Sequence, residues 1–302
     1  MQRKVSIPAS ADGLRLAAIV EAPEKPKAVV QFVHGMCEHK ERYVPFMEYL
    51  ASMGYACVIH DNRGHGESVK SMDDLGYMYN GGWRALVEDV RLVNEWIREE
   101  YPGLRCFLFG HSMGSMIVRS FVKRYDDMVD GLFVCGSPSY NPASAIARWV
   151  CGLMMWCGAG HCRPALIQKL AFDGFNKPFA KDGYPSAWVC SDKDVLEAYH
   201  SDPYCSFIFT ANGFHNLFAL MQDCYSKNGW GSRNAAMGVH FLSGGNDPCR
   251  ISDRHFLKAV ERMDRYYNTD YRLFSGMRHE VLNETDKYLV WEYVAGLIDR
   301  AL

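Results

Sequence analysis

The sequence predicts an α/β protein, built as a single domain of residues 1–302 around a mostly parallel, doubly wound sheet. Two observations support this class. Short, continuously apolar runs recur along both ends of the chain, and longer segments with helical periodicity separate them. Continuous runs of β-branched and aromatic residues are typical of strands covered on both faces. Strands that alternate with helices in this way favour parallel pairing.

The expected elements follow from these two patterns. Strands are predicted at residues 28–33, 56–59, 106–109, 131–135, 239–242 and 271–274. Residues 5–22, with a turn at Asp12-Gly13, predict an antiparallel hairpin before the parallel part. Apolar side chains recur on one helical face in the segment 83–99, and the segments 115–125 and 254–266 have similar patterns.

The alternation stops after Ser137-Pro138 and resumes near residue 215. The segment 138–214 has no clean strand pattern and is rich in Trp, Met, Phe, Gly and Pro. We therefore divide the domain into a core of residues 1–137 and 215–302 and an inserted lid of residues 138–214. Ligands of open α/β sheets bind at the carboxyl ends of the strands, and we expect the lid to cover that edge.

Composition excludes several classes of protein. The formal net charge of -2 gives no basis for a nucleic-acid partner. The 11 cysteines form no CxxC pair, so we expect reduced thiols and a cytoplasmic location. The first ten residues lack the apolar stretch of a signal peptide. The most apolar segment, residues 149–160, is shorter than the about 20 residues that span a bilayer.

The strongest motif is Gly110-His111-Ser112-Met113-Gly114, which fits the pattern G-x-S-x-G. The pattern alone is weak, but it directly follows the predicted strand at 106–109 and directly precedes the helical pattern at 115–125. A serine on such a strand–turn–helix junction is presented above the sheet as a nucleophile. We therefore predict that Ser112 is a catalytic nucleophile.

A serine nucleophile needs a base and an anion that orients the base. We assign the base to His279, which follows the last predicted strand, and the anion to Asp247, which lies on the Gly-rich loop after the strand at 239–242. The order Ser112, Asp247, His279 is the one known for nucleophiles of this type. The alternatives are a turn role for Asp247, which precedes Pro248, and a capping or surface role for His279.

The oxyanion of an acyl-transfer intermediate needs two N–H donors. We predict the backbone N–H of Met113, after the nucleophile, and that of Met36, on the loop after the strand at 28–33. We expect His34 to hold this loop by hydrogen bonds rather than to act as a base. Asp61 and Arg63 are expected to brace the next Gly-rich loop as hydrogen-bonded ion-pair residues, because the loop lacks the Lys and Ser/Thr of a phosphate-binding P-loop.

No metal or organic cofactor is expected. Cys157, His161 and Cys162 are the nearest candidates for a metal site, but no second ligand pair lies near them at zinc spacing.

Five motifs together resemble a known family. They are HGMCEHKERY (34–43), DNRGHGES (61–68), GHSMGS (110–115), GGNDPC (244–249) and RHEVLNE (278–284). This set is similar to the monoacylglycerol lipase and lysophospholipase branch of the α/β-hydrolases, the serine aminopeptidase S33-like group. The resemblance implies an α/β-hydrolase fold with a helical lid, and the same triad and oxyanion donors. It is weaker in the lid, where it lies mainly in SDPYC (201–205).

The expected activity is hydrolysis of a small-molecule acyl ester, such as a monoacylglycerol or a lysophospholipid. Trp149, Met154, Trp156 and Phe175 of the lid are our candidates for lining an acyl slot. The alternatives are an aminopeptidase-like hydrolase with the same triad and a non-catalytic binding scaffold. The apolar segment 149–160 could pack on the core or touch a membrane surface. The natural substrate and the oligomeric state stay open.

Overall fold

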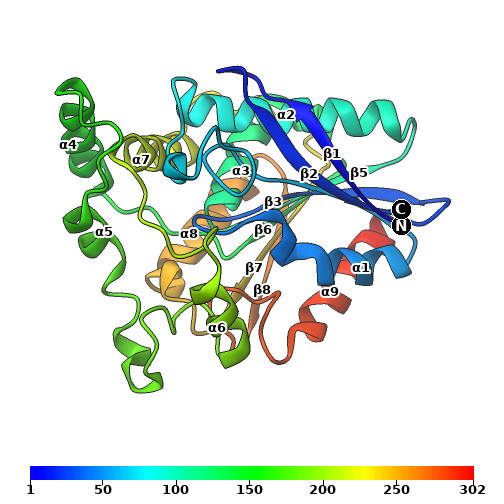
Figure 1. The fold of residues 1–302 in the computed structure, drawn as a ribbon. Coiled ribbons are helices and arrows are strands. Elements are labelled where there is room, and N and C mark those ends of the chain that lie inside the picture. Colours follow the sequence, from blue (N-terminus) through cyan, green and yellow to red (C-terminus); the bar gives the residue numbers. More distant parts are fainter.

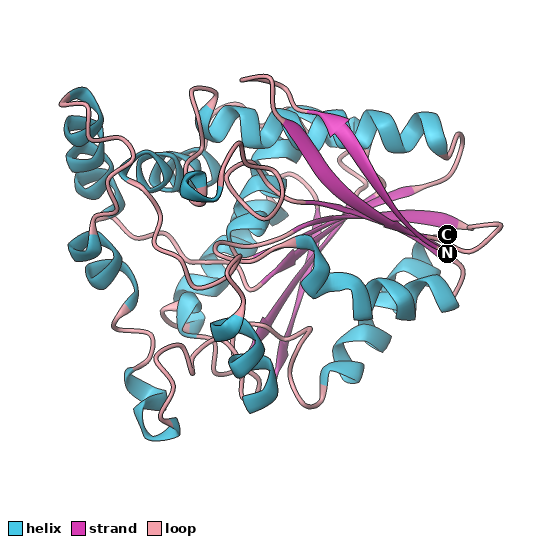
Figure 2. Ribbon diagram, viewed as in Figure 1, coloured by secondary structure: helices cyan, strands magenta, loops and turns pink.

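The fold is an eight-stranded sheet with helices on both faces, described for all residues 1–302 by a computed structural model (Figures 1 and 2). The strand order is β1-β2-β4-β3-β5-β6-β7-β8. β1 and β2 form the predicted hairpin, β2 pairs antiparallel with β4, and every later pairing is parallel. The strands are β1 Gln2–Pro8, β2 Arg15–Glu21, β3 Ala28–Val33, β4 Tyr55–His60, β5 Cys106–His111, β6 Gly131–Cys135, β7 Gly238–Gly244 and β8 Asn268–Phe274.

Helices cover the sheet in two layers, as the doubly wound class predicts (Figure 2). One face is covered by α1 (Val44–Ser52) and α9 (Lys287–Ala301), whose buried side chains belong to a core of 26 residues. The other face is covered by α2 (Gly82–Glu100), α3 (Met113–Tyr125) and α8 (Asp253–Asp264), within a core of 44 residues. The central strands β3 to β6 are buried at every position, which explains their continuous apolar runs.

The segment between β6 and β7 contains no strand. It forms α4 (Ser144–Trp156), α5 (Ala165–Phe172), a 3-10 helix (Lys177–Asp182) and α6 (Lys193–Ser201). These helices lie beyond the carboxyl ends of the parallel strands in Figure 1. α7 (Ala211–Tyr225) crosses residue 214, the end that we predict for the lid, and packs on α2 and α3. The last helix of this segment is therefore part of the core packing.

Two properties of the chain bear on the sequence expectations. All 11 cysteines are free, and only Cys157 and Cys162 among them are exposed. No helix of the structure is both long enough and apolar enough to cross a membrane.

Candidate active site

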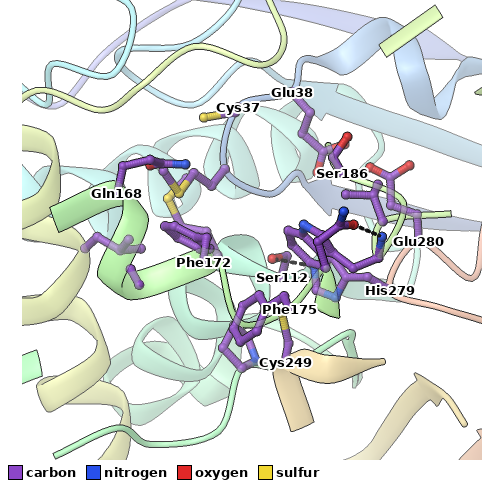
Figure 3. A pocket seen from close by; sticks show the side chains of 18 of the residues that line it. Cys37, Glu38, Ser112, Gln168, Phe172, Phe175, Ser186, Cys249, His279 and Glu280 are labelled. Carbon is purple, nitrogen blue, oxygen red and sulfur yellow. Dashed lines mark hydrogen bonds between the residues drawn. The ribbon is translucent and has the colours of Figure 1, made fainter. Parts of the chain in front are cut away.

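Ser112 lies on the turn between β5 and α3, where its backbone adopts φ 52° and ψ -117°. A non-glycine residue rarely adopts a positive φ, because the Cβ atom is crowded there. The flanking glycines permit the tight packing of this turn. A Cβ atom at Gly110 would lie 2.5 Å from the carbonyl oxygen of Gly114, and one at Gly114 would lie 2.1 Å from that of Val33. The turn places Ser112 at the wall of a cavity (Figure 3).

The structure brings the three candidate triad residues together. His279 Nε2 lies 2.8 Å from Ser112 Oγ, and His279 Nδ1 lies 3.0 Å from Asp247 Oδ2. A carboxylate only accepts hydrogen bonds, so Nδ1 carries the proton and Nε2 is left to accept from the serine hydroxyl. Both Asp247 and His279 are buried, on the loops that follow β7 and β8. This arrangement can remove the hydroxyl proton during nucleophilic attack.

Asp247 is held as an anion by its surroundings. The backbone N–H of Cys249 donates to Oδ1 at 2.9 Å, and the Ser243 hydroxyl donates to Oδ2 at 3.1 Å. Burial alone would raise the pKa of Asp247, but His279 and these hydrogen bonds lower it below the ordinary value. An ionised carboxylate beside Nδ1 fixes the orientation and the tautomer of the imidazole.

Two backbone donors face the same cavity. Met36 and Met113 both line it, and the N–H groups of both residues make no hydrogen bond within the protein. Met113 is the first residue of α3, where the N–H groups have no partner inside the helix. Gly35 allows the close approach of the Met36 loop, because a Cβ atom there would lie 3.0 Å from Ser112 Cβ. These two N–H groups are thus available to an oxyanion bound at Ser112.

The histidine that precedes this loop has the supporting contacts that the sequence predicts. His34 is fully buried, and its Nε2 accepts a hydrogen bond from the backbone N–H of Asn62 at 2.9 Å. The Asn62 side chain donates back to the carbonyl oxygen of His34 at 3.0 Å. Burial and the neighbouring His65 lower the pKa of His34 well below its ordinary value, so it stays neutral. His34 thereby ties the loop after β3 to the loop after β4.

Asp61 and Arg63 brace their loop, but they are not paired with each other. The Asp61 carboxylate lies 2.8 Å from Lys40 Nζ, and its pKa is raised because burial outweighs this contact. Arg63 Nε lies 2.7 Å from Asp89 Oδ2 and its Nη1 lies 3.0 Å from Asp12 Oδ2. Each residue therefore ties the loop to a different neighbouring segment.

A buried network of charged residues beside Ser112 is the main feature that the sequence analysis missed. Glu38 accepts a hydrogen bond from the backbone N–H of Gly35 and contacts His111 Nδ1 at 3.3 Å. Arg42 donates to Glu38 at 3.2 Å and to both oxygens of Glu280 at 2.6 Å. Burial alone would raise the pKa of Glu38, but His111 and Arg42 lower it well below the ordinary value.

This network also reaches the candidate base, His279. His111, which precedes Ser112 in the chain, places its Nε2 3.3 Å from the carbonyl oxygen of His279. Burial would lower the pKa of His111, but Glu38 raises it above the ordinary value. Glu38 and Glu280 belong to the motifs 34–43 and 278–284, and this membership is the only indication of the network in the sequence. Their convergence depends on the tertiary fold.

The cavity at Ser112 has a volume of about 730 Å³. One part carries the polar groups of Glu38, His111 and Glu280. Elsewhere it is closed by polar residues such as Gln168 and Asn176 together with apolar side chains of α3, α5, α7 and the following loops: Met116, Phe172, Phe175, Leu217, Phe218 and Met221. Figure 3 shows Phe172 and Phe175 of the inserted segment opposite Ser112 and His279. The site can therefore hold a molecule with a polar end and an apolar chain.

Of the four lid residues predicted to line an acyl slot, only Phe175 lines this cavity. Trp149, Met154 and Trp156 do not, so for these three the sequence expectation does not match the cavity. Trp149 is 68% exposed and Trp156 is 84% exposed on α4. The reason is the packing of α4, which buries Ser144 and Cys151, sets Gly152 against His215 of α7 and turns its large apolar residues outward.

Groups that could hold a metal are already engaged in other contacts. His39, Asp202 and Cys205 converge, but the two His39 nitrogens lie 2.7 Å from Glu41 and 2.8 Å from Asp202. Asp247, Cys249 and His279 also converge, and they are the candidate triad and its neighbour.

Cys157, His161 and Cys162 belong to neither of these two clusters. His161 lies 3.3 Å from Asp74 and stacks on Tyr77, while Cys157 and Cys162 are exposed.

The sheet order, the serine on the turn after β5, and the Asp and His that follow β7 and β8 define an α/β-hydrolase. The chain belongs to the family described as serine aminopeptidase, S33, which matches residues 24–286. Within it, the chain falls in the monoacylglycerol lipase and lysophospholipase branch that the five motifs predict.

Individual relatives cover nearly the whole chain. A monoacylglycerol lipase of Mycolicibacterium smegmatis is 26% identical over 96% of this chain and 95% of that protein. The phospholipase YtpA of Bacillus subtilis is 31% identical over 92% of this chain and 97% of that protein. Among solved structures, a thermostable carboxyl esterase from Bacillus coagulans in complex with glycerol superposes with a TM-score of 0.92 at 22% identity, covering 99% of this chain and 98% of that one.

Proposed function

We propose that the protein is a serine hydrolase that cleaves carboxylic esters of lipid-like acyl substrates, such as a monoacylglycerol or a lysophospholipid. The observation that carries the proposal is the chain of contacts from Ser112 Oγ through His279 to Asp247, at 2.8 Å and 3.0 Å. Ser112 and His279 line a cavity that carries both polar and apolar side chains. Relatives named as a monoacylglycerol lipase and a phospholipase support the same substrate class.

The proposed reaction proceeds in two acyl-transfer steps. Ser112 attacks the ester carbonyl carbon while His279 Nε2 takes its proton, and Asp247 stabilises the imidazolium that forms. The N–H groups of Met36 and Met113 stabilise the oxyanion. His279 then returns the proton to the leaving alcohol, and the acyl group stays on Ser112. Water, activated by the same histidine, releases the fatty acid and restores the serine.

The two parts of the cavity suit the two parts of such a substrate. The apolar part, with Met116, Phe175 and Leu217 among its residues, can hold an acyl chain without leaving polar groups unpaired. The polar part, at Glu38 and Glu280, offers acceptors to the hydroxyl groups of a glycerol moiety.

The test is the variant Ser112→Ala. We expect loss of at least about three orders of magnitude in the kcat for long-chain monoacylglycerol and for p-nitrophenyl esters, together with loss of labelling by a fluorophosphonate probe. Ser71→Ala is the matched control, because Ser71 is exposed and its side chain caps no helix. Activity of Ser112→Ala above about 1% of the parent would refute the proposal.

The family description also names aminopeptidases, so amide hydrolysis is the second candidate. A free substrate amine would need an unpaired carboxylate near the nucleophile. Glu38 and Glu280, which line the cavity, are already paired with Arg42, whereas the exposed Asp173, which also lines it, forms no ion pair and offers a carboxylate to such an amine. A panel of monoacylglycerols, lysophospholipids and aminoacyl amides separates the candidates. Failure of Ser112 to react with a fluorophosphonate probe, together with no turnover of any of them, would favour a non-catalytic binding scaffold.

We further propose that α4 touches a membrane surface. Its apolar side chains form one exposed stripe, with Ile146 71%, Trp149 68% and Trp156 84% exposed. A helix face of this kind can enter the headgroup region of a bilayer. The variant Trp149→Ala/Trp156→Ala should reduce co-sedimentation with phosphatidylcholine vesicles while the hydrolysis of a water-soluble ester is unchanged. Equal co-sedimentation of variant and parent would contradict this role.

A further inference from the structure

A second cavity, of about 510 Å³, lies outside the active site. Its walls come from the end of α7, from α8 and from the loop that leads from β6 into α4. The residues that matter are basic or aromatic: Lys227, His255, Lys258, Arg262, Tyr140 and Tyr225. No acidic residue lines it.

The cations of this cavity have no counter-ions in the protein. Lys227, Lys258 and Arg262 form no ion pair, although the chain as a whole carries a net charge of -2. Neither lysine side chain makes a hydrogen bond within the protein. Three like charges that line one cavity repel one another, and an anion bound between them would relieve this repulsion.

Further donors are available at the same place. Arg262 donates one hydrogen bond, from Nη1 to the carbonyl oxygen of Tyr225, and its Nη2 makes none within the protein. His255 contacts Ser252 through Nδ1 only, at 2.8 Å, which leaves Nε2 free. Ammonium, guanidinium and imidazole donors are the groups that bind phosphate oxygens in proteins.

We propose that this cavity binds a phosphate group, carried either by a small phosphate ester or by the headgroup of an anionic phospholipid. The volume of about 510 Å³ leaves room for a phosphate and an attached organic moiety. The cavity shares a wall with the active site. Pro138, Ser139 and Asn141 line the cavity of Ser112, while Tyr140 and Pro142 of the same loop line the basic one.

The position of α4 bears on the lipid source of the phosphate. Its exposed apolar stripe begins at Ile146, a few residues after Pro142 at the rim of the basic cavity. A protein that rests on a membrane through α4 brings this cavity close to the headgroups. The cavity is also open to a soluble phosphate ester. The proposal concerns binding and is independent of whether Ser112 is the nucleophile.

The test uses the intact chain and the variant Lys227→Gln/Lys258→Gln. Both lysines are exposed and unpaired, so their loss leaves the fold intact. The control is Lys25→Gln/Lys193→Gln, which removes the same charge from exposed positions elsewhere. Titration calorimetry measures binding of inorganic phosphate and glycerol 3-phosphate. Co-sedimentation measures the extra binding to phosphatidylcholine vesicles when phosphatidic acid is added.

If the source is a soluble ester, calorimetry detects binding by the parent and the control, and the double variant binds about tenfold more weakly or less. If the source is a lipid, phosphatidic acid increases vesicle binding of the parent and of the control but not of the double variant, and calorimetry detects no binding of the soluble phosphates. Lys258→Glu, which reverses one charge on α8, should reproduce the loss. The proposal is overturned if the parent binds none of the probes, or if Lys227→Gln/Lys258→Gln binds them as the control does.

Discussion

Replacing Asp247 by Asn removes the charge of the candidate triad while keeping its shape. In the parent, Asp247 Oδ2 lies 3.0 Å from His279 Nδ1 and both residues are buried. When His279 takes the serine proton, an imidazolium forms beside the carboxylate. Two unit charges at this separation attract by about 5 kcal/mol at an effective dielectric constant of about 20. This stabilisation exists only after proton transfer, so its loss raises the barrier.

A barrier increase of this size corresponds to about a 10³–10⁴-fold lower kcat. The Asn side chain can also donate a hydrogen bond to Nδ1 and so favour the wrong tautomer. The assay is steady-state hydrolysis of a p-nitrophenyl ester and of a monoacylglycerol, with thermal unfolding to show that the variant is folded. Asp194→Asn, on an exposed turn of α6, is the control. A folded Asp247→Asn variant with less than about a tenfold loss would refute the assigned role.

Three further predictions test the packing, the charge and the pocket. Gly114→Ala should lower the Tm by about 3–10 °C, because its Cβ would lie 2.1 Å from a carbonyl oxygen of β3; an unchanged Tm in calorimetry would contradict the packing argument. Burial alone would lower the pKa of His39, but its contacts with the neighbouring Cys205, Glu41 and Asp202 raise it to about 10. The contribution of His39 to stability is therefore full below about pH 6.5 and is lost as the pH rises through about 10. In urea unfolding, His39→Gln should have a lower free energy of unfolding than the parent at about pH 6, and the difference should shrink by about pH 10. A difference that does not change with pH would exclude an ion pair between His39 and its two carboxylates. Phe175→Ala should raise the KM for a long-chain ester about five- to thirtyfold and leave that for an acetyl ester nearly unchanged; equal effects on both esters would show that Phe175 does not contact the acyl chain.

The sheet was predictable because its signal is local. The strands at 28–33 and 131–135 have the expected bounds, and the hairpin turns at Asp12-Gly13, both of which adopt positive φ. The strand–turn–helix context of Ser112 is local too. The loops that carry Asp247 and His279 follow neighbouring parallel strands, β7 and β8, so their meeting at one sheet edge follows from topology.

The cavity lining was not predictable, because an apolar pattern shows that a helix has an apolar face but not which way that face points. On α4 the small residues Ser144 and Cys151 are buried, whereas Trp149 and Trp156 are exposed. Helices usually bury their large apolar face, and α4 does the reverse. The network of Glu38, His111 and Glu280 was not predicted for another reason, because contacts between distant segments leave no periodic pattern in the sequence.

The left-handed backbone at Ser112 limits which nucleophile this fold can use. At φ 52° a single Cβ substituent is tolerated, but a β-branched side chain is crowded by its own backbone. Threonine offers the same hydroxyl chemistry, yet it would strain the turn that presents that hydroxyl to His279. Cysteine has the unbranched shape that the turn accepts. At position 112 we therefore expect a cysteine to be tolerated better than a threonine.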